Sequence, residues 1–399
     1  MEEYKNNPLE QEEFKKLYDE LQNIEKQLET EPNNIEFLFM KSDIFYKLWE
    51  WDYALETILE ILEKKPDSTE AKFKLGILKD LTGASEEALN IFEELFKKNP
   101  ENTNILFNLA YIHYKNENFE IAEDYINKLI HSNPDSQILF FCAGFYSDVG
   151  ELGKAIEIME TIVEKEPQNP TFLAELAYLY NLDGLYEDSI KLMKKAIELE
   201  PQNILYLIRY SNFLLDIEEY EKASKILDKA LEIEPQNAFV FAEKASLYLL
   251  TGDFNNALIS IDQAIQLEDN PVFHAQKGIL LMEKYDYQNA LKELDISLQH
   301  DDSDLPTLLA KAQCLTLLNR YKDSNQILQE IVEEIPYDLV IQSYMAFNYF
   351  QLNDKHNATL WLKSILNEDK DFFAYAATEH PFMDRILSNT AFQLFCNQN

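Results

Sequence analysis

The sequence predicts an all-helical protein built as a stack of about ten helix-turn-helix repeats, and three observations predict this fold class. First, YEDSIKLMKKAIELEPQN at residues 186–203 is followed 34 positions later by YEKASKILDKALEIEPQN at residues 220–237. Second, small residues recur at two fixed places in every repeat. Third, prolines recur in steps of 34 residues, or once 33, at Pro32, Pro66, Pro100, Pro134, Pro167, Pro201 and Pro235, and Pro336 lies three further steps along.

Each repeat is defined by its first residue and by its two small residues. The repeats start at Ile35, Thr69, Thr103, Gln137, Pro170, Ile204, Ala238, Pro271, Leu305 and Leu339. Their eighth places hold Ser42, Gly76, Ala110, Gly144, Ala177, Ser211, Ala245, Gly278, Ala312 and Ala346. Their twentieth places hold Ala54, Ala88, Ala122, Ala155, Ser189, Ala223, Ala257, Ala290, Ser324 and Ala358, with one residue deleted before Ala155. Because small side chains let two helices approach closely, we expect Gly144→Leu to overpack its repeat and to destabilise it by about 1–3 kcal/mol.

The parts of a repeat follow one another in a fixed order. Between the two small places lies a turn signal, such as Val149-Gly150, Asp183-Gly184 or Thr251-Gly252. An aromatic residue usually opens the second segment, as at Trp51, Phe119, Tyr186, Tyr220, Phe254, Tyr287 and Tyr321. Proline then ends this segment, because proline cannot continue a helix. Each repeat is therefore predicted to be helix, short turn, helix.

The two ends of the chain differ from the repeats. Between Leu9 and Glu29, apolar residues recur at steps of three and four, which predicts one amphipathic helix; they are Phe14, Leu17, Leu21, Ile24 and Leu28. After residue 370, the aromatic-rich segment carries residues that could cover the last repeat, namely Phe382, Ile386, Leu387, Phe392 and Phe395. We therefore predict an N-terminal capping helix in residues 1–34, ten repeats in residues 35–370 and a C-terminal capping segment in residues 371–399.

Four of these features together resemble one known family over residues 35–370. The 34-residue period, the small eighth and twentieth residues, the aromatic near the seventeenth place and the terminal proline resemble the tetratricopeptide repeat. The resemblance implies a right-handed superhelical solenoid whose first helices line a concave groove. The sequence departs from the family pattern at the fourth place, where the usual tryptophan is replaced by Leu38, Lys72, Leu106 and Phe140, and at a usually apolar place that holds Lys244, Lys277 and Lys311.

Acidic residues dominate the charge of the chain, with 72 Asp and Glu against 35 Lys and Arg, a net charge of -37. Such a charge repels phosphate backbones, so we expect no nucleic acid partner; it either keeps a long stack soluble or attracts a basic partner. No apolar run approaches the roughly 18 residues of a membrane span, and the first residues lack the features of a signal peptide. Since Cys142, Cys314 and Cys396 are scattered, we expect a reducing, cytoplasmic location, although a chain trimmed of a signal peptide would read the same.

No pattern of catalytic, metal-binding or cofactor-binding residues occurs in the sequence. There is no glycine-rich phosphate loop, no HExxH and no GxSxG, and the six histidines are spread singly over different repeats. We therefore expect no enzymatic activity, no metal and no cofactor. The Lys and Asn pattern with which the family holds a partner's C-terminal carboxylate is also missing, because Phe73 and Ile77 stand where that pattern needs Lys and Asn.

The resemblance implies that the second, fifth, sixth, ninth, twelfth and thirteenth places of each first helix face a ligand. Nine of the thirteen aromatic residues at these places lie in the first five repeats. The candidate peptide-binding residues are the aromatic Phe39, Tyr46, Phe73, Phe107, Tyr111, Tyr114, Phe141, Phe145 and Tyr178, and the acidic Asp80, Asp148 and Glu175. An aromatic groove with carboxylates suits a protein or peptide segment with apolar and basic residues. We therefore expect a scaffold or adaptor that binds such a segment.

Three alternatives stay open at this point. The chain could be a structural subunit whose convex face, on the second helices, is buried in a larger assembly. The groove aromatics could pack only against the next repeat, and the binding surface could instead be the tail of residues 371–399. Exposed apolar side chains on the second helices would favour the subunit, whereas an exposed aromatic groove would favour the adaptor. The sequence leaves the oligomeric state open.

Overall fold

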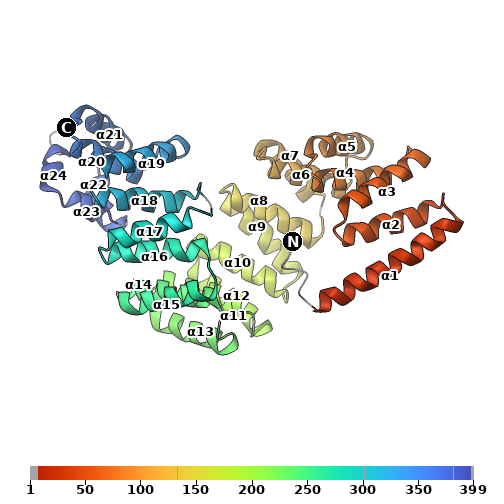
Figure 1. Cartoon of the computed structure of the whole chain (residues 1–399), viewed down its shortest axis with the longest axis horizontal. Coiled ribbons are helices and arrows are strands. Elements are labelled where there is room, and N and C mark those ends of the chain that lie inside the picture. The colour runs from red at the N-terminus through yellow and green to blue at the C-terminus, as the bar shows by residue number, and fades with distance from the viewer. Residues whose placement is uncertain (1–7, 133, 301, 381, 397–399) are drawn as a thin grey trace. The chain divides into compact units, whose positions relative to one another are not determined.

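The computed structural model describes residues 8–132, 134–300, 302–380 and 382–396. Within these ranges the chain forms twenty-four α-helices and no strand (Figure 1). The helices pack into two compact units, an N-terminal unit (Met1–Leu185) and a C-terminal unit (Tyr186–Asn399). The boundary between the units falls between the two helices of the fifth repeat.

The N-terminal unit contains one long helix, the two helices of each of the first four repeats, and the first helix of the fifth repeat. The long helix is α1 (Pro8–Thr30). The first helices are α2 (Ile35–Lys47), α4 (Thr69–Leu81), α6 (Thr103–Lys115), α8 (Ser136–Asp148) and α10 (Pro170–Leu182). The second helices are α3 (Trp51–Lys64), α5 (Ser85–Lys98), α7 (Phe119–His131) and α9 (Leu152–Lys165).

The C-terminal unit continues the alternation and ends in three short helices. Its first helices are α12 (Ile204–Asp216), α14 (Ala238–Leu250), α16 (Pro271–Glu283), α18 (Leu305–Leu317) and α20 (Leu339–Gln351). Its second helices are α11 (Tyr186–Leu199), α13 (Tyr220–Ile233), α15 (Phe254–Leu267), α17 (Tyr287–Ser297), α19 (Tyr321–Glu334) and α21 (Lys355–Glu368). The last three are α22 (Phe372–Glu379), α23 (Met383–Leu387) and α24 (Thr390–Cys396).

Every first helix starts at a side-chain cap. The residue before each first helix is Asn, Asp or Ser, and its side chain accepts a hydrogen bond from a backbone N–H of the first turn; these residues are Asn34, Ser68, Asn102, Asp135, Asn169, Asn203, Asn237, Asn270, Asp304 and Asp338. Such a cap satisfies backbone donors that the helix itself leaves unpaired, which stabilises it by about 1 kcal/mol. The caps therefore fix where the repeats begin.

The turn inside every repeat uses one residue with a positive φ, at the fifteenth place. Four repeats have glycine there, whereas the other six have Trp49, Glu117, Glu218, Tyr285, Asn319 and Asn353, with φ between 60° and 62°. A side chain in this left-handed conformation costs on the order of 1 kcal/mol, since its Cβ crowds the following carbonyl oxygen. The turn geometry thus overrides the local preference of the residue in the four repeats that have Trp, Glu or Tyr at this place, whereas asparagine tolerates the left-handed conformation.

Exchange of Glu218 for glycine is therefore expected to raise the free energy of unfolding of the C-terminal unit, by about 0.5–1 kcal/mol. Glu218 is exposed, so the substitution removes no buried contact. The matched control is Gly252→Ala, at the same place in the next repeat with φ 75° and open space around a new Cβ. It should lower stability by about 1 kcal/mol in urea unfolding. Equal effects of the two changes would contradict this account of the turn.

The two small places of a repeat lie in direct contact, as predicted. The Ser42 hydroxyl donates to the Ala54 carbonyl at 3.3 Å, and the Ser324 hydroxyl donates to the Ala312 carbonyl at 2.8 Å. A Cβ added to Gly76 would lie 2.7 Å from the ring of Phe92. Small residues at these places therefore permit the close packing of the two helices in each repeat.

The predicted start of the fourth repeat is wrong by one residue. The helix α8 starts at Ser136 rather than Gln137, because Asp135 caps it. Consequently Ala143, which is buried, takes the eighth place, and no deletion is needed before Ala155. Gly144 moves to the ninth place and is exposed, and a Cβ added to it meets nothing within 4 Å. The expectation that Gly144→Leu overpacks the repeat is therefore wrong.

The terminal segments pack against the repeats next to them. Leu21 and Ile24 of α1 are buried in one cluster with residues of α2 and α3. At the other end, Ile386 and Phe392 share a buried cluster with Tyr344 of α20. Phe382, expected to cover the last repeat, instead belongs to the cluster of α16, α17 and α18. The C-terminal segment therefore packs against the eighth and ninth repeats as well as the last one. Pro381 and residues 397–399 lie outside the described ranges.

Candidate functional site

Four of the predicted aromatic residues form one continuous cluster, which we call the α6–α8 aromatic cluster: Phe107, Tyr111 and Tyr114 of α6 and Phe141 of α8. The centroid of the Phe141 ring lies 4.9 Å from that of Phe107 and 6.2 Å from those of Tyr111 and Tyr114. Phe107 and Tyr111, one helical turn apart, are stacked at 6.2 Å. Tyr111 is 40% exposed, and the other three side chains are partly buried. The cluster thus presents an aromatic surface that is only partly covered by the protein.

A carboxylate borders this cluster. The Tyr114 hydroxyl donates a hydrogen bond to Oδ2 of Asp148, one repeat further along. This hydrogen bond, together with partial burial, raises the pKa of Tyr114 to about 12, so the phenol stays protonated and the carboxylate accepts. Asp148 is exposed, and its carboxyl group lies at the edge of the rings. The site can therefore attract a cation next to an apolar anchor.

Asp80 does not act as a second free carboxylate of this kind. It is buried, and its Oδ1 accepts hydrogen bonds from Ser85 Oγ at 2.7 Å and from Lys115 Nζ at 3.2 Å. An ion pair with Lys115 cancels most of its charge toward a ligand. The prediction that Asp80 supplies negative charge to the groove is therefore wrong, because Asp80 is paired with Lys115.

Tyr46 lies in a separate hollow between the first two repeats. Tyr46, Ser42 and Asp43 of α2 and residues of α4 line a cavity of about 190 Å³. Lys74 Nζ forms an ion pair with Asp43 Oδ1 across it. Tyr46 is exposed, so this hollow offers a second, smaller aromatic surface that also carries both signs of charge.

The remaining predicted residues divide into packed and exposed ones. Phe39 is partly buried against the core of the first repeats, and Phe73 packs edge-on against Phe92 at 5.6 Å. Phe145 is only 2% exposed, because the corrected start of α8 turns it from the groove into the core. On α10, Glu175 is half-buried and Tyr178 is exposed. Phe39, Phe73 and Phe145 thus pack within the protein, and the ring contact of Phe73 with Phe92 lies within one repeat rather than against the next.

Aromatic residues at two of the turns were not among the predicted binding residues, although Trp51 and Tyr287 were predicted to open second helices. Trp49 and Trp51 flank Glu50 in the first repeat, and Tyr285 and Tyr287 flank Asp286 in the eighth. Both trios occupy the fifteenth to seventeenth places. The signal was in the sequence, because no other repeat has aromatic residues at both the fifteenth and the seventeenth place.

No group of three or more His, Cys, Asp or Glu within the described ranges could hold a metal ion. Burial raises the pKa of the Cys142 and Cys314 thiols to about 12, so neither is a thiolate nucleophile at neutral pH. In the part of the chain that the structure describes, no helix is long and apolar enough to cross a membrane.

Comparisons with known proteins agree with this architecture. A family model of the tetratricopeptide repeat matches residues 82–139, within the N-terminal unit. This match identifies residues 82–139 as tetratricopeptide repeats. A second family model, ChAPs (Chs5p-Arf1p-binding proteins), matches residues 147–269. No curated protein sequence matches it.

Solved structures of other proteins are similar to the chain. The Cut9–Hcn1 hetero-tetramer of APC/C matches with a TM-score of 0.51 and 12% identity, over 89% of this chain and 76% of that one. Yeast Tom70 matches with a TM-score of 0.44 and 14% identity, over 89% and 99%. A tetratricopeptide repeat protein of Thermus thermophilus matches with a TM-score of 0.43 and 21% identity, over 46% and 100%. The Cut9–Hcn1 likeness confirms the all-helical, solenoid-type fold.

Proposed function

We propose that this tetratricopeptide repeat protein is a non-catalytic scaffold that binds an apolar and basic segment of a partner protein at the α6–α8 aromatic cluster. The observation that carries the proposal is the joining of Phe107, Tyr111, Tyr114 and Phe141 into one partly exposed surface beside Asp148. Aromatic side chains supply a large contact area at low entropic cost, and they dominate the energy of many interfaces.

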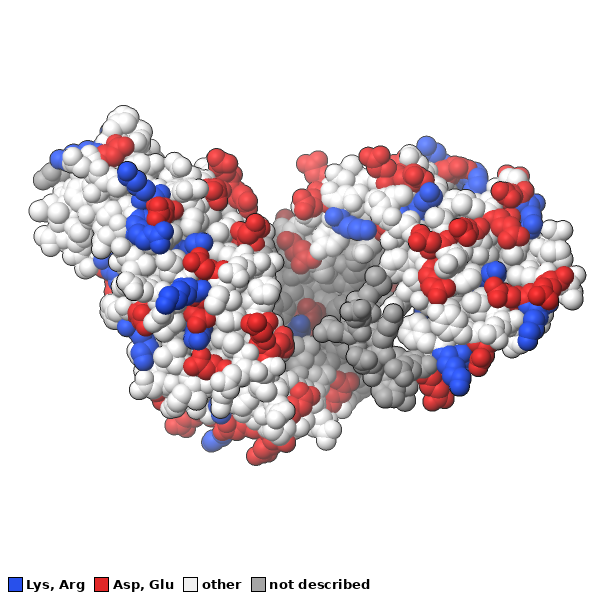
Figure 2. All heavy atoms as spheres, in the orientation of Figure 1, with Lys and Arg blue, Asp and Glu red and all other residues white. Residues whose placement is uncertain are grey.

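The charge of the protein supports a basic partner. Figure 2 shows Asp and Glu spread over the visible face, with fewer Lys and Arg between them. With a net charge of -37, long-range attraction speeds the approach of a cationic segment, whereas the rings hold it once it has bound. The three cysteines form no disulfide, which supports the cytoplasmic location that we propose.

Binding of a captured partner should weaken by about 2 kcal/mol in each of Phe107→Ala and Tyr111→Ala, since each change removes part of the buried contact. Partners are captured from the native cell with the full chain and are then measured by titration calorimetry. Asp148→Lys should mainly slow association and reduce its salt dependence, because an edge charge acts before contact.

The matched control for these changes is Tyr337→Ala, which truncates an exposed tyrosine of the C-terminal unit that is 75% exposed. It should leave affinity unchanged. Unchanged binding to the Phe107 and Tyr111 double variant would contradict the proposal, and binding through residues 371–399 alone would assign the function to the tail.

The same capture separates two partner classes. The ChAPs family is named for binding Chs5p and Arf1p, so purified Arf1p and Chs5p are direct probes of the full chain. A structural subunit would instead co-purify in fixed stoichiometry and be insensitive to changes in the cluster. The second helices expose only scattered apolar residues, such as Leu59, Ile121, Ile259 and Leu360, and single exposed residues of this kind are normal on soluble proteins.

A further inference from the structure

Two turns of the protein share an aromatic-acid-aromatic pattern and the same backbone. Trp49-Glu50-Trp51 joins α2 to α3, and Tyr285-Asp286-Tyr287 joins α16 to α17. The backbone of the first aromatic residue of each trio has the left-handed conformation, with φ 60° in Trp49 and 62° in Tyr285. Equal backbone conformations at equal places of the repeat point the Cα–Cβ bonds of the aromatic residues in comparable directions, so what one turn does indicates what the other can do.

The turn of the eighth repeat holds an arginine side chain. The guanidinium carbon of Arg385 lies 4.4 Å from the ring centroid of Tyr285 and 5.8 Å from that of Tyr287. Its nitrogens donate to the Met282 carbonyl at 2.7 Å and to Glu283 Oε2 at 2.9 Å. The side chain of Arg385 is only 9% exposed. Cation–π contact, a backbone acceptor and a carboxylate together make this turn a built guanidinium site.

The segment that carries this arginine lies close to two successive turns. Phe382, three residues before Arg385, belongs to a buried cluster that Leu317 and Leu318 pack against, where α18 ends. Leu318 stands at the fourteenth place of the ninth repeat. Residues 382–385 therefore extend from the turn of the eighth repeat toward the turn of the ninth.

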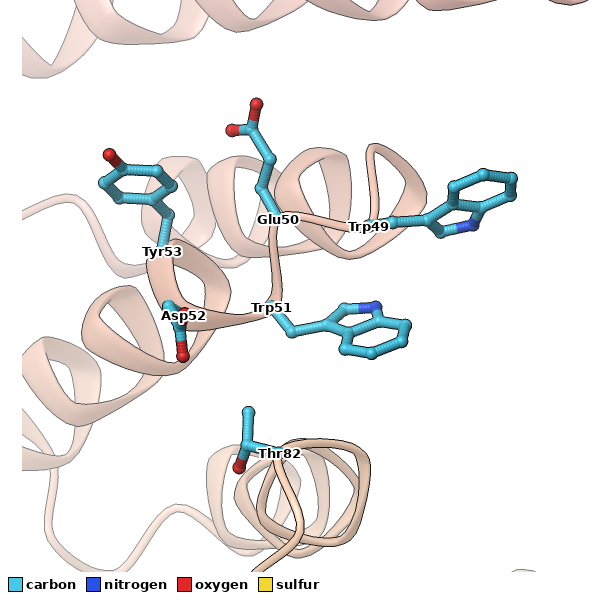
Figure 3. A pocket seen from close by; sticks show the side chains of 6 residues that line it. All are labelled: Trp49, Glu50, Trp51, Asp52, Tyr53 and Thr82. Carbon is cyan, nitrogen blue, oxygen red and sulfur yellow. The ribbon is translucent and has the colours of Figure 1, made fainter. Parts of the chain in front are cut away.

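A pocket occupies the same place in the first two repeats. A cavity of about 380 Å³ is lined by Trp49, Glu50, Trp51, Asp52, Tyr53 and Thr82 (Figure 3). Thr82 stands at the fourteenth place of the second repeat, as Leu318 does in the ninth. Figure 3 shows the indoles of Trp49 and Trp51 projecting to the same side of the turn. Trp49, although Phe14 packs edge-on against it at 5.7 Å, remains 48% exposed.

The charges around this pocket suit a cation, but their arrangement differs from that around Arg385 in the eighth repeat. Two carboxylates, Glu50 and Asp52, line it, and Glu50 Oε1 accepts a hydrogen bond from Tyr18 at 2.8 Å. The place of Glu283 is taken by Lys47, which is exposed. Attraction by the two carboxylates is thus opposed in part by one lysine, so a bound cation should be held more weakly than Arg385 is.

We infer that the pocket of Trp49, Trp51 and Thr82 binds an arginine side chain of a partner protein. Arginine fits better than lysine, because a planar guanidinium stacks on aromatic faces and donates in a fork to carboxylates, whereas an ammonium is a strongly hydrated point charge. The site is formed by the turns and is distinct from the α6–α8 aromatic cluster, so it stands independently of the proposed function.

The probe is a synthetic peptide with the protein's own arginine-bearing sequence, HPFMDRILS, taken from residues 380–388. It is titrated into the full chain and followed by calorimetry and tryptophan fluorescence. Replacement of the peptide arginine by lysine should weaken binding about fivefold or more. Trp49→Gly keeps the left-handed turn and removes the indole, and it should weaken binding by about tenfold. Lys47→Glu gives the first repeat a carboxylate at the place that Glu283 holds in the eighth repeat. This change should tighten binding by about threefold or more.

The matched control is Tyr285→Gly, the same change in the turn of the eighth repeat. It detects a peptide that displaces Arg385 instead of entering the first pocket. The inference is overturned if Trp49→Gly and Lys47→Glu both leave the affinity unchanged, if Tyr285→Gly alone abolishes binding, or if the lysine peptide binds as well as the arginine peptide. Circular dichroism of Trp49→Gly confirms its fold, and should that variant not fold, the Lys47→Glu titration decides alone. Phe107→Ala, which tests the proposed function, should not alter binding of this peptide.

Discussion

Replacement of Asn348 by leucine is expected to lower the free energy of unfolding of the C-terminal unit by about 3 kcal/mol. Asn348 of α20 is fully buried, and its amide donates to Ser324 Oγ at 3.0 Å and to Asn325 Oδ1 at 2.9 Å. Its Oδ1 accepts from the Thr316 hydroxyl at 3.0 Å. Leucine has a similar volume but no polar atom, so these partners would remain buried without their hydrogen bonds.

The size of this effect follows from how the network is closed. Ser324 already donates to the Ala312 carbonyl at 2.8 Å, so its lone pairs, rather than its proton, serve Asn348. Thr316 and Asn325 lie on α18 and α19, so one side chain ties three helices together. Each buried polar group that loses its partner costs about 1–3 kcal/mol. The total loss of unfolding free energy is therefore larger than the loss caused by a typical surface substitution.

Urea unfolding by circular dichroism and hydrogen exchange of α18–α20 measure the loss. The matched test is the double variant Asn348→Leu with Thr316→Val, which removes both partners of one hydrogen bond. It should recover part of the loss, because removal of both partners costs less than leaving one unsatisfied. A loss below about 1 kcal/mol in the single variant would show that the network contributes little to stability.

Gly278→Leu is expected to destabilise the eighth repeat by about 3 kcal/mol through overpacking. A Cβ alone would lie 2.7 Å from Cγ of Leu294 and 3.4 Å from the Ala290 carbonyl oxygen. Leu294 is fully buried between α16 and its neighbours, and a backbone oxygen cannot move aside as a side chain can. The new side chain would therefore push the two helices of the repeat apart.

Gly144→Leu is the matched control, since Gly144 is also helical but exposed and meets nothing within 4 Å. A leucine there has higher helix propensity than glycine and should change stability by no more than about 1 kcal/mol, in the favourable direction. Both variants are compared with the parent chain in urea unfolding. Similar losses at Gly278 and Gly144 would mean that the eighth place carries no special packing requirement.

Most of the helices could be predicted from the sequence because the determinants of a repeat are local. The period and the small residues recur ten times, prolines stand at eight of the steps, and the side-chain caps fix the helix starts. Nine of the ten predicted first residues agree with the structure. The exception, Gln137, arose because Gly144 and Ala143 are both small, so the eighth place was ambiguous. The cap at Asp135 resolves that ambiguity.

The candidate site was less predictable, because whether a groove residue is exposed depends on its neighbours. Tyr111 and Phe73 both stand at groove places, yet Tyr111 is exposed, whereas Phe73 packs on Phe92. Asp80 was predicted to supply charge to the groove, but it pairs with Lys115, one repeat away. The pairing of Asp80 depends on a side chain 35 residues away, and the burial of Phe73 depends on one in the second helix of the same repeat.

The sequence by itself determined the fold class, the helix pairs and the acidic character of the protein, since these follow from periodicity and composition. Only the tertiary structure decided that Arg385 returns to the turn of the eighth repeat, about 100 residues earlier in the chain. It also joined four rings from two repeats into one cluster. A repeated pattern determines the contacts that recur between neighbouring repeats. It cannot determine a contact that occurs only once, such as that of Arg385 with the turn of the eighth repeat.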